Sequence, residues 1–375
     1  MKMENKQNRE AFLALVRAGL WEQDVQLLPY GDVDYSEIYR LAEEQSVIGL
    51  VTAGIEHVVD VKVPKDNVLT FVGRSLQIER RNIEMNHFLA VLTRRFRDEK
   101  IEAILVKGQG VAQCYERPLW RSSGDIDLIL NEKYYPIAKK YLSRFAVDIE
   151  EEYAYTSHIA MSISGWEVEL HGNLRTTLSK RIDNELDDVL RDTFSNGHVR
   201  KWKNENTEVL LPSPDNDVIF IFTHILQHFF KWGIGLRQIC DWCRLLWTYR
   251  DTLDICLLES RLRKMGLMSE WKAFAAIAVS LLGIHQDAMP LYDSKPCWRK
   301  KALRILSCIL KAGNLGHNRD MSYLKKYPFV VRKMVSLWHH TCDGMRHFGV
   351  FPMDSAKIWG RMLTRGVKIA VVGDR

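Results

Sequence analysis

The segment that most constrains this chain is residues 124–130, which read GDIDLIL. Its apolar residues predict a buried strand, and on a strand residues i and i+2 point to the same face. Asp125 and Asp127 therefore share one face. Two ionised carboxylates there repel each other and are costly to desolvate unless cations neutralise them. The spacing predicts a site for divalent cations, and carboxylate oxygens suit Mg²⁺.

An isolated D-x-D string is common, and its simpler interpretation is an edge strand whose two acids face solvent. The preceding residues 105–110, LVKGQG, favour the metal site. They predict a strand end, a glycine turn at Gly108 and a helix that begins near Val111. Backbone amides at such a helix start bind phosphate. Lys107 and Arg121 would add charge-assisted contacts to a triphosphate.

A two-metal phosphoryl transfer uses a further acid near the attacking hydroxyl. Residues 156–174 contain two alternating runs broken by Gly165, which predicts a hairpin. In the second run Glu167, Glu169 and His171 fall on one face. Glu169, flanked by His171, is our candidate for the third acid, although a period of two leaves Glu167 equally possible.

The chain resembles the uncharacterised nucleotidyltransferases of the DNA polymerase beta superfamily, a group of minimal nucleotidyltransferases with a GDIDL motif. The resemblance rests on Lys107-Gly108, Tyr115, Pro118, Arg121, the GDIDL string and the VELH string at residues 168–171. It covers residues 103–174. It extends more weakly over 212–245 through Pro212, His224, His228, Arg237 and Asp241.

This resemblance implies a nucleotidyltransferase fold with a mixed sheet and a helical appendage. It implies that Asp125, Asp127 and Glu169 are metal ligands and that Gly108 lies in the nucleotide loop. The expected nucleotide-binding residues are Lys107, Gly108, Arg121 and Gly124. Two departures stand out: Gln109 replaces the serine or glycine usual after this glycine, and the 17-residue interval from Gly108 to Asp125 is long for the wider superfamily.

Composition bounds the class of protein. A chain of 375 residues with 46% hydrophobic and 27% charged residues is typical of soluble globular proteins with two or three domains. No apolar stretch approaches the ~20 residues of a membrane span, and the start lacks a signal region. Seven scattered cysteines fit a reducing cytoplasm. We interpret the C-x-x-C of Cys240 and Cys243 as buried structural thiols.

The charge is unevenly distributed. Residues 295–375 contain 17 lysines and arginines against four aspartates, whereas the rest of the chain is net acidic. Such a basic end would suit a phosphate-rich partner or an anionic surface. Because no nucleic-acid motif accompanies it, docking on the acidic body or a solvated face is the favoured interpretation.

Hydrophobic periodicity predicts an α+β fold in which a nucleotidyltransferase-type mixed sheet is flanked by N-terminal and C-terminal helical regions. The expected domains are 1–100, 101–212 and 213–375. One helix is expected through Met85, Leu89 and Phe96. Another is expected through Ile38, Leu41, Ile48 and Leu50, with its N-cap near Asp34. Further elements are expected as strands at 101–106, 147–155, 159–164 and 166–171, helices at 131–144 and 178–194, and a boundary at 196–217 with a possible hairpin.

Two residue pairs in the C-terminal region have helical spacing. His224 and His228 lie four apart but lack the glutamate of zinc proteases, so packing at a seam or an acceptor pocket is favoured over zinc. Arg237 and Asp241 would form an exposed helix ion pair, or Arg237 would reach a phosphate if it faced the cleft.

The sequence therefore predicts an Mg²⁺-dependent enzyme, with two ions and Mn²⁺ as an alternative, that transfers a nucleoside monophosphate from a nucleoside triphosphate. The acceptor is a small molecule, a protein or RNA. The alternatives are a nucleotide-binding regulatory module and a nucleic-acid-binding protein that uses the basic end. Asp127→Asn is expected to abolish transfer and, by relieving repulsion, to raise the melting temperature without metal.

Overall fold

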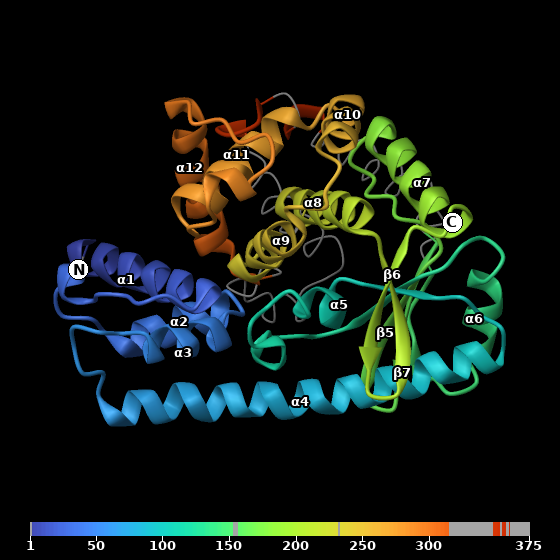
Figure 1. Ribbon diagram of the computed structural model, residues 1–375, viewed down its shortest axis with the longest axis horizontal. Coiled ribbons are helices and arrows are strands. Elements are labelled where there is room, and N and C mark those ends of the chain that lie inside the picture. The colour runs from blue at the N-terminus through green and yellow to red at the C-terminus, as the bar shows by residue number, and fades with distance from the viewer. Residues whose placement is uncertain are drawn as a thin grey trace, which may run out of the picture.

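The fold is described from a computed structural model, which describes residues 2–152, 157–231, 233–314, 348–352, 355–357 and 360. The N-terminal part is helical, as expected. Its helices are α1 (Lys2–Trp21), α2 (Tyr35–Glu44), α3 (Ile48–Glu56) and α4 (Lys65–Asp98), with the short 3-10 helix η1 (Leu28–Tyr30). Figure 1 shows α4 running along one edge of the molecule, beneath both the other N-terminal helices and the sheet.

The single helix expected through Ile38 and Leu50 is wrong, because the structure has two helices there. Asp34 does cap α2, where its side chain accepts hydrogen bonds from the amides of Ser36 and Glu37. After α2 the chain turns at Ser46, which has a left-handed φ of 56°. An α-helix cannot continue through such a residue, so the apolar residues that follow begin α3.

Helix α4 belongs to two cores. Its first half buries Phe71 against the N-terminal helices, in a cluster that extends to the C-terminal helices. Its second half buries Met85, Leu89 and Phe96 in the cluster beneath the sheet. The expected domain boundaries after residues 100 and 212 both fall between elements, but the packing of α4 continues across the first of them.

The central sheet has five strands in the order β1-β2-β5-β4-β3. They are β1 (Ile104–Val106), β2 (Ile126–Ile129), β3 (Asp148–Ile149), β4 (His158–Ile163) and β5 (Trp166–His171). Strands β2 and β5 are parallel and the other neighbours are antiparallel. The mixed sheet and the α+β class are therefore confirmed.

Several expected boundaries differ from the observed ones. The first strand is shorter than 101–106, and helix α5 (Gly108–Ala112) begins at Gly108 rather than near Val111. Helix α6 (Tyr135–Leu142) lies within the expected 131–144. The strand expected at 147–155 is reduced to β3 among the described residues, and residues 153–156 lie outside them.

Residues 196–217, where the sequence predicts a boundary with a possible hairpin, contain a two-stranded hairpin. Helix α7 (Lys180–Ser195) leads into a hairpin of β6 (Val199–Asn204) and β7 (Thr207–Pro212). Val209 and Leu211 of β7 are buried in the cluster beneath the sheet. The hairpin therefore packs against one side of the central sheet.

The C-terminal helices are α8 (Pro214–Lys231), α9 (Leu236–Tyr249), α10 (Ile255–Met265), α11 (Met268–Ser280) and α12 (Pro296–Ala312). They form the upper layer in Figure 1. Cys240 and Cys243 are fully buried on α9, as expected of structural thiols. Much of the basic C-terminal segment, residues 315–347 and 361–375, lies outside the described residues.

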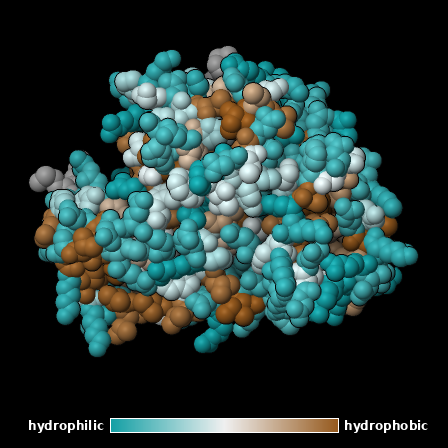
Figure 2. Space-filling model, in the orientation of Figure 1, coloured by the Kyte–Doolittle hydropathy of each residue, from teal (hydrophilic) through white to brown (hydrophobic). Residues whose placement is uncertain are grey.

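The described surface is mostly polar. In Figure 2 apolar surface gathers at the lower left, over the N-terminal helices and part of α4. Exposed apolar side chains of the N-terminal helical part of the chain include Leu28, Val59, Leu69 and Leu76. Among the described helices, none combines the length and the apolar character that a membrane crossing requires.

Candidate active site

The three candidate acids meet on one face of the sheet. In the parallel pairing of β2 with β5, Asp127 lies directly beside Glu169. Asp125 comes one residue before β2 and is half-buried. Ligand oxygens of Asp125, Asp127 and Glu169 all lie within 4.8 Å of one another. Three carboxylates at this separation have the spacing of ligands to a shared cation.

A strained turn brings Lys107 onto the same face. Lys107 has φ 56°, a left-handed value unusual for a residue other than glycine, and Gly108 follows with φ 39°. Strained backbone of this kind clusters at functional sites. The Lys107 Nζ lies 2.6 Å from Oδ1 of Asp127, whose side chain is only 1% exposed. Lys107 therefore partly neutralises the buried aspartate.

Two histidines bind the same carboxylates. His171 Nε2 lies 2.9 Å from Asp127 Oδ1 and 3.4 Å from Glu169 Oε2. His158 Nε2 lies 3.0 Å from Glu169 Oε2. His158, on β4, was missed from the sequence. The signal that reveals it is the two-residue hairpin turn at Ser164-Gly165, which sets the register that pairs His158 with His171.

Burial, repulsion between the carboxylates and hydrogen bonds shift the pKa values of several groups in the cluster. Repulsion by Asp127, followed by burial, raises the pKa of Asp125. Burial opposes ionisation of Glu169, but hydrogen bonds from His158 and His171 hold its pKa well below the usual range. Burial lowers the pKa of Lys107 and His171, yet their carboxylate partners raise both above their usual values.

Glu169 and Glu167 differ in exposure and in the residues beside them. Glu167 is exposed and pairs in register with Ser162, farther along β5. Burial and the charge of Glu169 raise its pKa. Only Glu169 shares a cluster of possible ligand atoms with the two aspartates among the described residues.

Arg121 is held by Asp241. Its Nε and Nη2 lie 2.8 and 2.7 Å from the two carboxylate oxygens of Asp241, and Tyr115 donates a hydrogen bond to the same carboxylate. Arg121 Nη1 donates to Ser122 O and Ser123 Oγ. The expected helix pair of Arg237 with Asp241 is therefore wrong, because Asp241 forms a buried bidentate pair with Arg121 instead.

Arg237 lies beside this pair with a less complete set of partners. It is the second residue of α9, and its Nη1 donates a 2.7 Å hydrogen bond to Ser122 O. Its buried Nε has no hydrogen-bond partner among the described residues. Burial and the charge of Arg121 lower its pKa, while Asp241 and Asp125 oppose that shift. A guanidinium near Asp125 with an unused donor is suited to an anion.

His224 and His228 lie on α8 with ring centroids 4.2 Å apart. Burial and the charge of Lys107 lower the pKa of both, that of His228 to about 3. The Lys107 Nζ lies 6.0 Å from the ring centroid of Phe220, one turn earlier on α8. Helix α8 therefore presents neutral imidazoles near the acidic cluster.

Gln109 follows Gly108 in the glycine turn, at a position where the wider superfamily usually has serine or glycine. The Gln109 side chain is buried and its Nε2 donates to Asn82 Oδ1 on α4. A Cβ added at Gly108 would lie 3.5 Å from the carbonyl oxygen of Asp125, whereas one added at Gly124 would meet nothing within 4 Å. The turn thus borders the first aspartate, and Gln109 anchors it from beneath.

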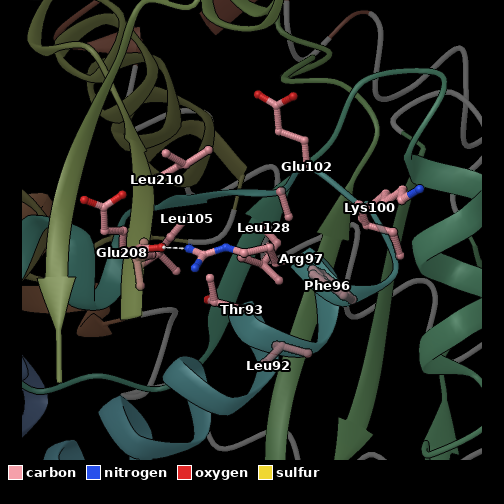
Figure 3. A pocket seen from close by; sticks show the side chains of 13 residues that line it. Leu92, Thr93, Phe96, Arg97, Lys100, Glu102, Leu105, Leu128, Glu208 and Leu210 are labelled. Atoms are coloured by element: carbon pink, nitrogen blue, oxygen red, sulfur yellow. Dashed lines mark hydrogen bonds between the residues drawn. The ribbon is translucent and has the colours of Figure 1, made fainter. Parts of the chain in front are cut away.

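A cavity of about 230 Å³ lies on the side of β1 and β2 that faces away from the three acids (Figure 3). Its walls include Leu105 of β1 and Leu128 of β2, which are paired in register, and Leu128 is next in sequence to Asp127. Arg97 crosses its edge and donates to the carbonyl of Glu208. Because strand neighbours point to opposite faces, this cavity and the acidic cluster are separated by the sheet.

The residues present fit divalent metal ions. The cluster supplies carboxylate oxygens within 4.8 Å of one another, which are the ligands that Mg²⁺ and Mn²⁺ prefer. Repulsion by Asp127 and burial raise the pKa of Asp125, and a bound cation would oppose both effects.

Comparison with protein families shows the family of this chain. A family model described as an uncharacterised nucleotidyltransferase matches residues 31–283. Among solved structures, the chain is similar to an antigenic nucleotidyltransferase-like protein from Paracoccidioides brasiliensis, with 14% identity over 54% of this chain and 93% of that one and a TM-score of 0.33. Comparison with curated proteins found no match. Because the family match covers well over half of its residues, this chain belongs to the uncharacterised nucleotidyltransferase family.

Proposed function

We propose that this protein is a GDIDL-type minimal nucleotidyltransferase of the DNA polymerase beta superfamily. It moves a nucleoside monophosphate from a nucleoside triphosphate to an acceptor. The acceptor oxygen forms a bond to the α-phosphorus as the bond to the leaving pyrophosphate breaks. The observation that carries this proposal is the convergence of Asp125, Asp127 and Glu169 on one face of β2 and β5.

Asp125, Asp127 and Glu169 would hold two Mg²⁺ ions, with Mn²⁺ as a substitute. Bound divalent ions supply positive charge against the phosphates and the attacking oxygen. The lowered pKa of Glu169 keeps this residue ionised, as a metal ligand must be. The ammonium group of Lys107 contacts Asp127. When a cation binds Asp127 in its place, Lys107 is positioned to contact a phosphate.

The phosphates would be bound by Lys107, the backbone around Gly108 and Gly124, and Arg237. Arg237 supports this role because it lies near Asp125 and has an unused buried donor. Arg121 would stabilise the site without contacting the phosphates, because its guanidinium is paired with Asp241. His224 and His228 would border the acceptor, a small molecule, a protein or an RNA end.

The experiment that tests this function does not need the acceptor. Wild-type protein is titrated calorimetrically with non-hydrolysable analogues of the four nucleoside triphosphates and Mg²⁺. We expect binding of at least one analogue, lost on addition of a chelator and reduced in Asp127→Asn.

Asp293→Asn is the matched control, because Asp293 forms a lysine pair of 3.0 Å with Lys272 outside the site. It should bind like the wild type. Absence of Mg²⁺-dependent binding for all four analogues, or equal binding by Asp127→Asn, would contradict the proposal.

A further inference from the structure

A second group of ligand atoms lies next to the three acids, on β4 and β5. His158 and His171 pair directly across these antiparallel strands. The Nε2 atoms of both face Oε2 of Glu169, at 3.0 and 3.4 Å respectively. The ligand atoms of the three residues all lie within 4.8 Å of one another.

These separations resemble those around a tetrahedral metal ion. Ligands that lie ~2.0–2.2 Å from Zn²⁺ at tetrahedral angles are about 3.4 Å from one another. The two measured nitrogen-to-oxygen distances, 3.0 and 3.4 Å, are within a few tenths of that value. Small shifts of the side chains would bring all three atoms to bonding distance of one ion.

The ligand set differs in kind from the neighbouring one. Asp125, Asp127 and Glu169 offer only oxygens, which suit Mg²⁺, whereas two imidazoles with a carboxylate suit zinc and related transition metals. We infer that His158, Glu169 and His171 form a distinct site for a transition-metal dication of the Zn²⁺ class, which shares Glu169 with the proposed magnesium site.

The surrounding sheet is compatible with this site. Ala160 lies directly across from Glu169 in the β4–β5 register, and its small side chain leaves room for His158, two residues earlier on β4, to reach the Glu169 carboxylate at 3.0 Å. A carboxylate has two oxygens and about four lone-pair positions. Glu169 can therefore serve both ligand groups. The competing interpretation is that the two histidines only orient Glu169 by hydrogen bonds.

The test measures metal binding by the full-length protein and needs no turnover. Metal-free protein is titrated with Zn²⁺ against a chromophoric chelator, and separately with Mg²⁺. Loss of a group that merely orients a ligand costs about 10–100-fold in metal affinity, so loss of a ligand should cost at least ~100-fold. We expect His158→Gln to weaken Zn²⁺ binding by this amount and Mg²⁺ binding by far less, because the glutamine amide can still donate a hydrogen bond to Glu169.

His87→Gln is the matched control, because His87 forms an exposed pair of 3.0 Å with the single carboxylate of Glu205. It should bind Zn²⁺ like the wild type. Equal Zn²⁺ affinity in wild type and His158→Gln would overturn the inference. X-ray absorption of the Zn²⁺-loaded wild type gives a second readout that needs no variant. Scattering from two imidazoles supports the site, and an oxygen-only shell overturns it.

The inference does not depend on nucleotidyl transfer. Zn²⁺ binding through His158 without Mg²⁺-dependent triphosphate binding would contradict the proposed function and support the zinc-class site. Mg²⁺-dependent triphosphate binding without Zn²⁺ binding through His158 would contradict the zinc-class site alone.

Discussion

Asp127 and Glu169 lie side by side in register on the parallel strands β2 and β5. Their strands come from segments about forty residues apart, and the chain between them passes through α6, β3 and β4. Lys107 and His171 both contact Asp127, at 2.6 and 2.9 Å. The pairing therefore creates a compensated site for Asp127, whereas Asp125 has a raised pKa.

This asymmetry predicts opposite effects for two similar substitutions. Without metal, Asp125→Asn should raise the melting temperature, because it removes repulsion with Asp127. Asp127→Asn should lower stability by up to about 3–5 kcal/mol, because it leaves Lys107 without its buried partner. The expected loss of stability in Asp127→Asn is the reverse of the rise in melting temperature predicted from the sequence. Thermal unfolding in the presence of a chelator measures both, and a rise for Asp127→Asn would contradict the account.

A second prediction separates the two arginines. Arg121→Ala should destabilise the fold by about 3–5 kcal/mol, since it breaks a buried ion pair, and should leave triphosphate affinity of the folded protein unchanged. Asp241→Asn, its matched partner, should behave in the same way. Chemical unfolding together with calorimetric titration provides the two readouts.

Arg237→Ala should instead weaken binding of a non-hydrolysable triphosphate about ten- to a hundredfold, as expected for loss of a charge-assisted contact of ~1.5–3 kcal/mol. Unaltered triphosphate affinity in Arg237→Ala would show that Arg237 does not bind the nucleotide. Weaker triphosphate affinity in folded Arg121→Ala would show that Arg121 binds it.

The histidines of α8 predict a dependence of stability on pH. The folded-state pKa of His228 is about 3, against ~6.5 in the unfolded chain. Between these values only the unfolded state binds the proton, so stability falls as pH falls through this window. The slope for one histidine reaches about 1.4 kcal/mol per pH unit.

His228→Asn should therefore lose less stability than the wild type between about pH 7 and pH 5, in which range the unfolded histidine titrates. Urea unfolding at both values measures the difference. An identical pH dependence in the two proteins would show that His228 does not stay neutral in the fold.

Local patterns in the sequence predicted the strands of the site and the side chains on their faces. The alternation in β5 placed Glu169 and His171 together, and the helix cap at Asp34 followed from residue type. Alternation alone could not choose between Glu167 and Glu169, because that choice depends on the register with β2. His158 was within reach, since the hairpin turn fixes its register with His171.

Contacts between distant segments could not be predicted in this way. Arg121 and Asp241 are 120 residues apart, and nothing in their local sequence favours their pair over the helical spacing of Arg237 and Asp241. The packing of α4 against both the N-terminal helices and the sheet likewise depends on tertiary contacts. Periodicity predicts a helix but not the partners of its two halves.

We propose that Asp125, Asp127 and Glu169, on the shared face of β2 and β5, carry nucleotidyl transfer. The most direct measurement is pyrophosphate release from nucleoside triphosphates with Mg²⁺ and fractionated acceptors, compared among wild type, Asp127→Asn and the Asp293→Asn control. We expect release by the wild type and the control. In Asp127→Asn we expect the rate of release to fall at least about a thousandfold, which corresponds to a barrier increase of ~4 kcal/mol. Release by Asp127→Asn at the wild-type rate would contradict it.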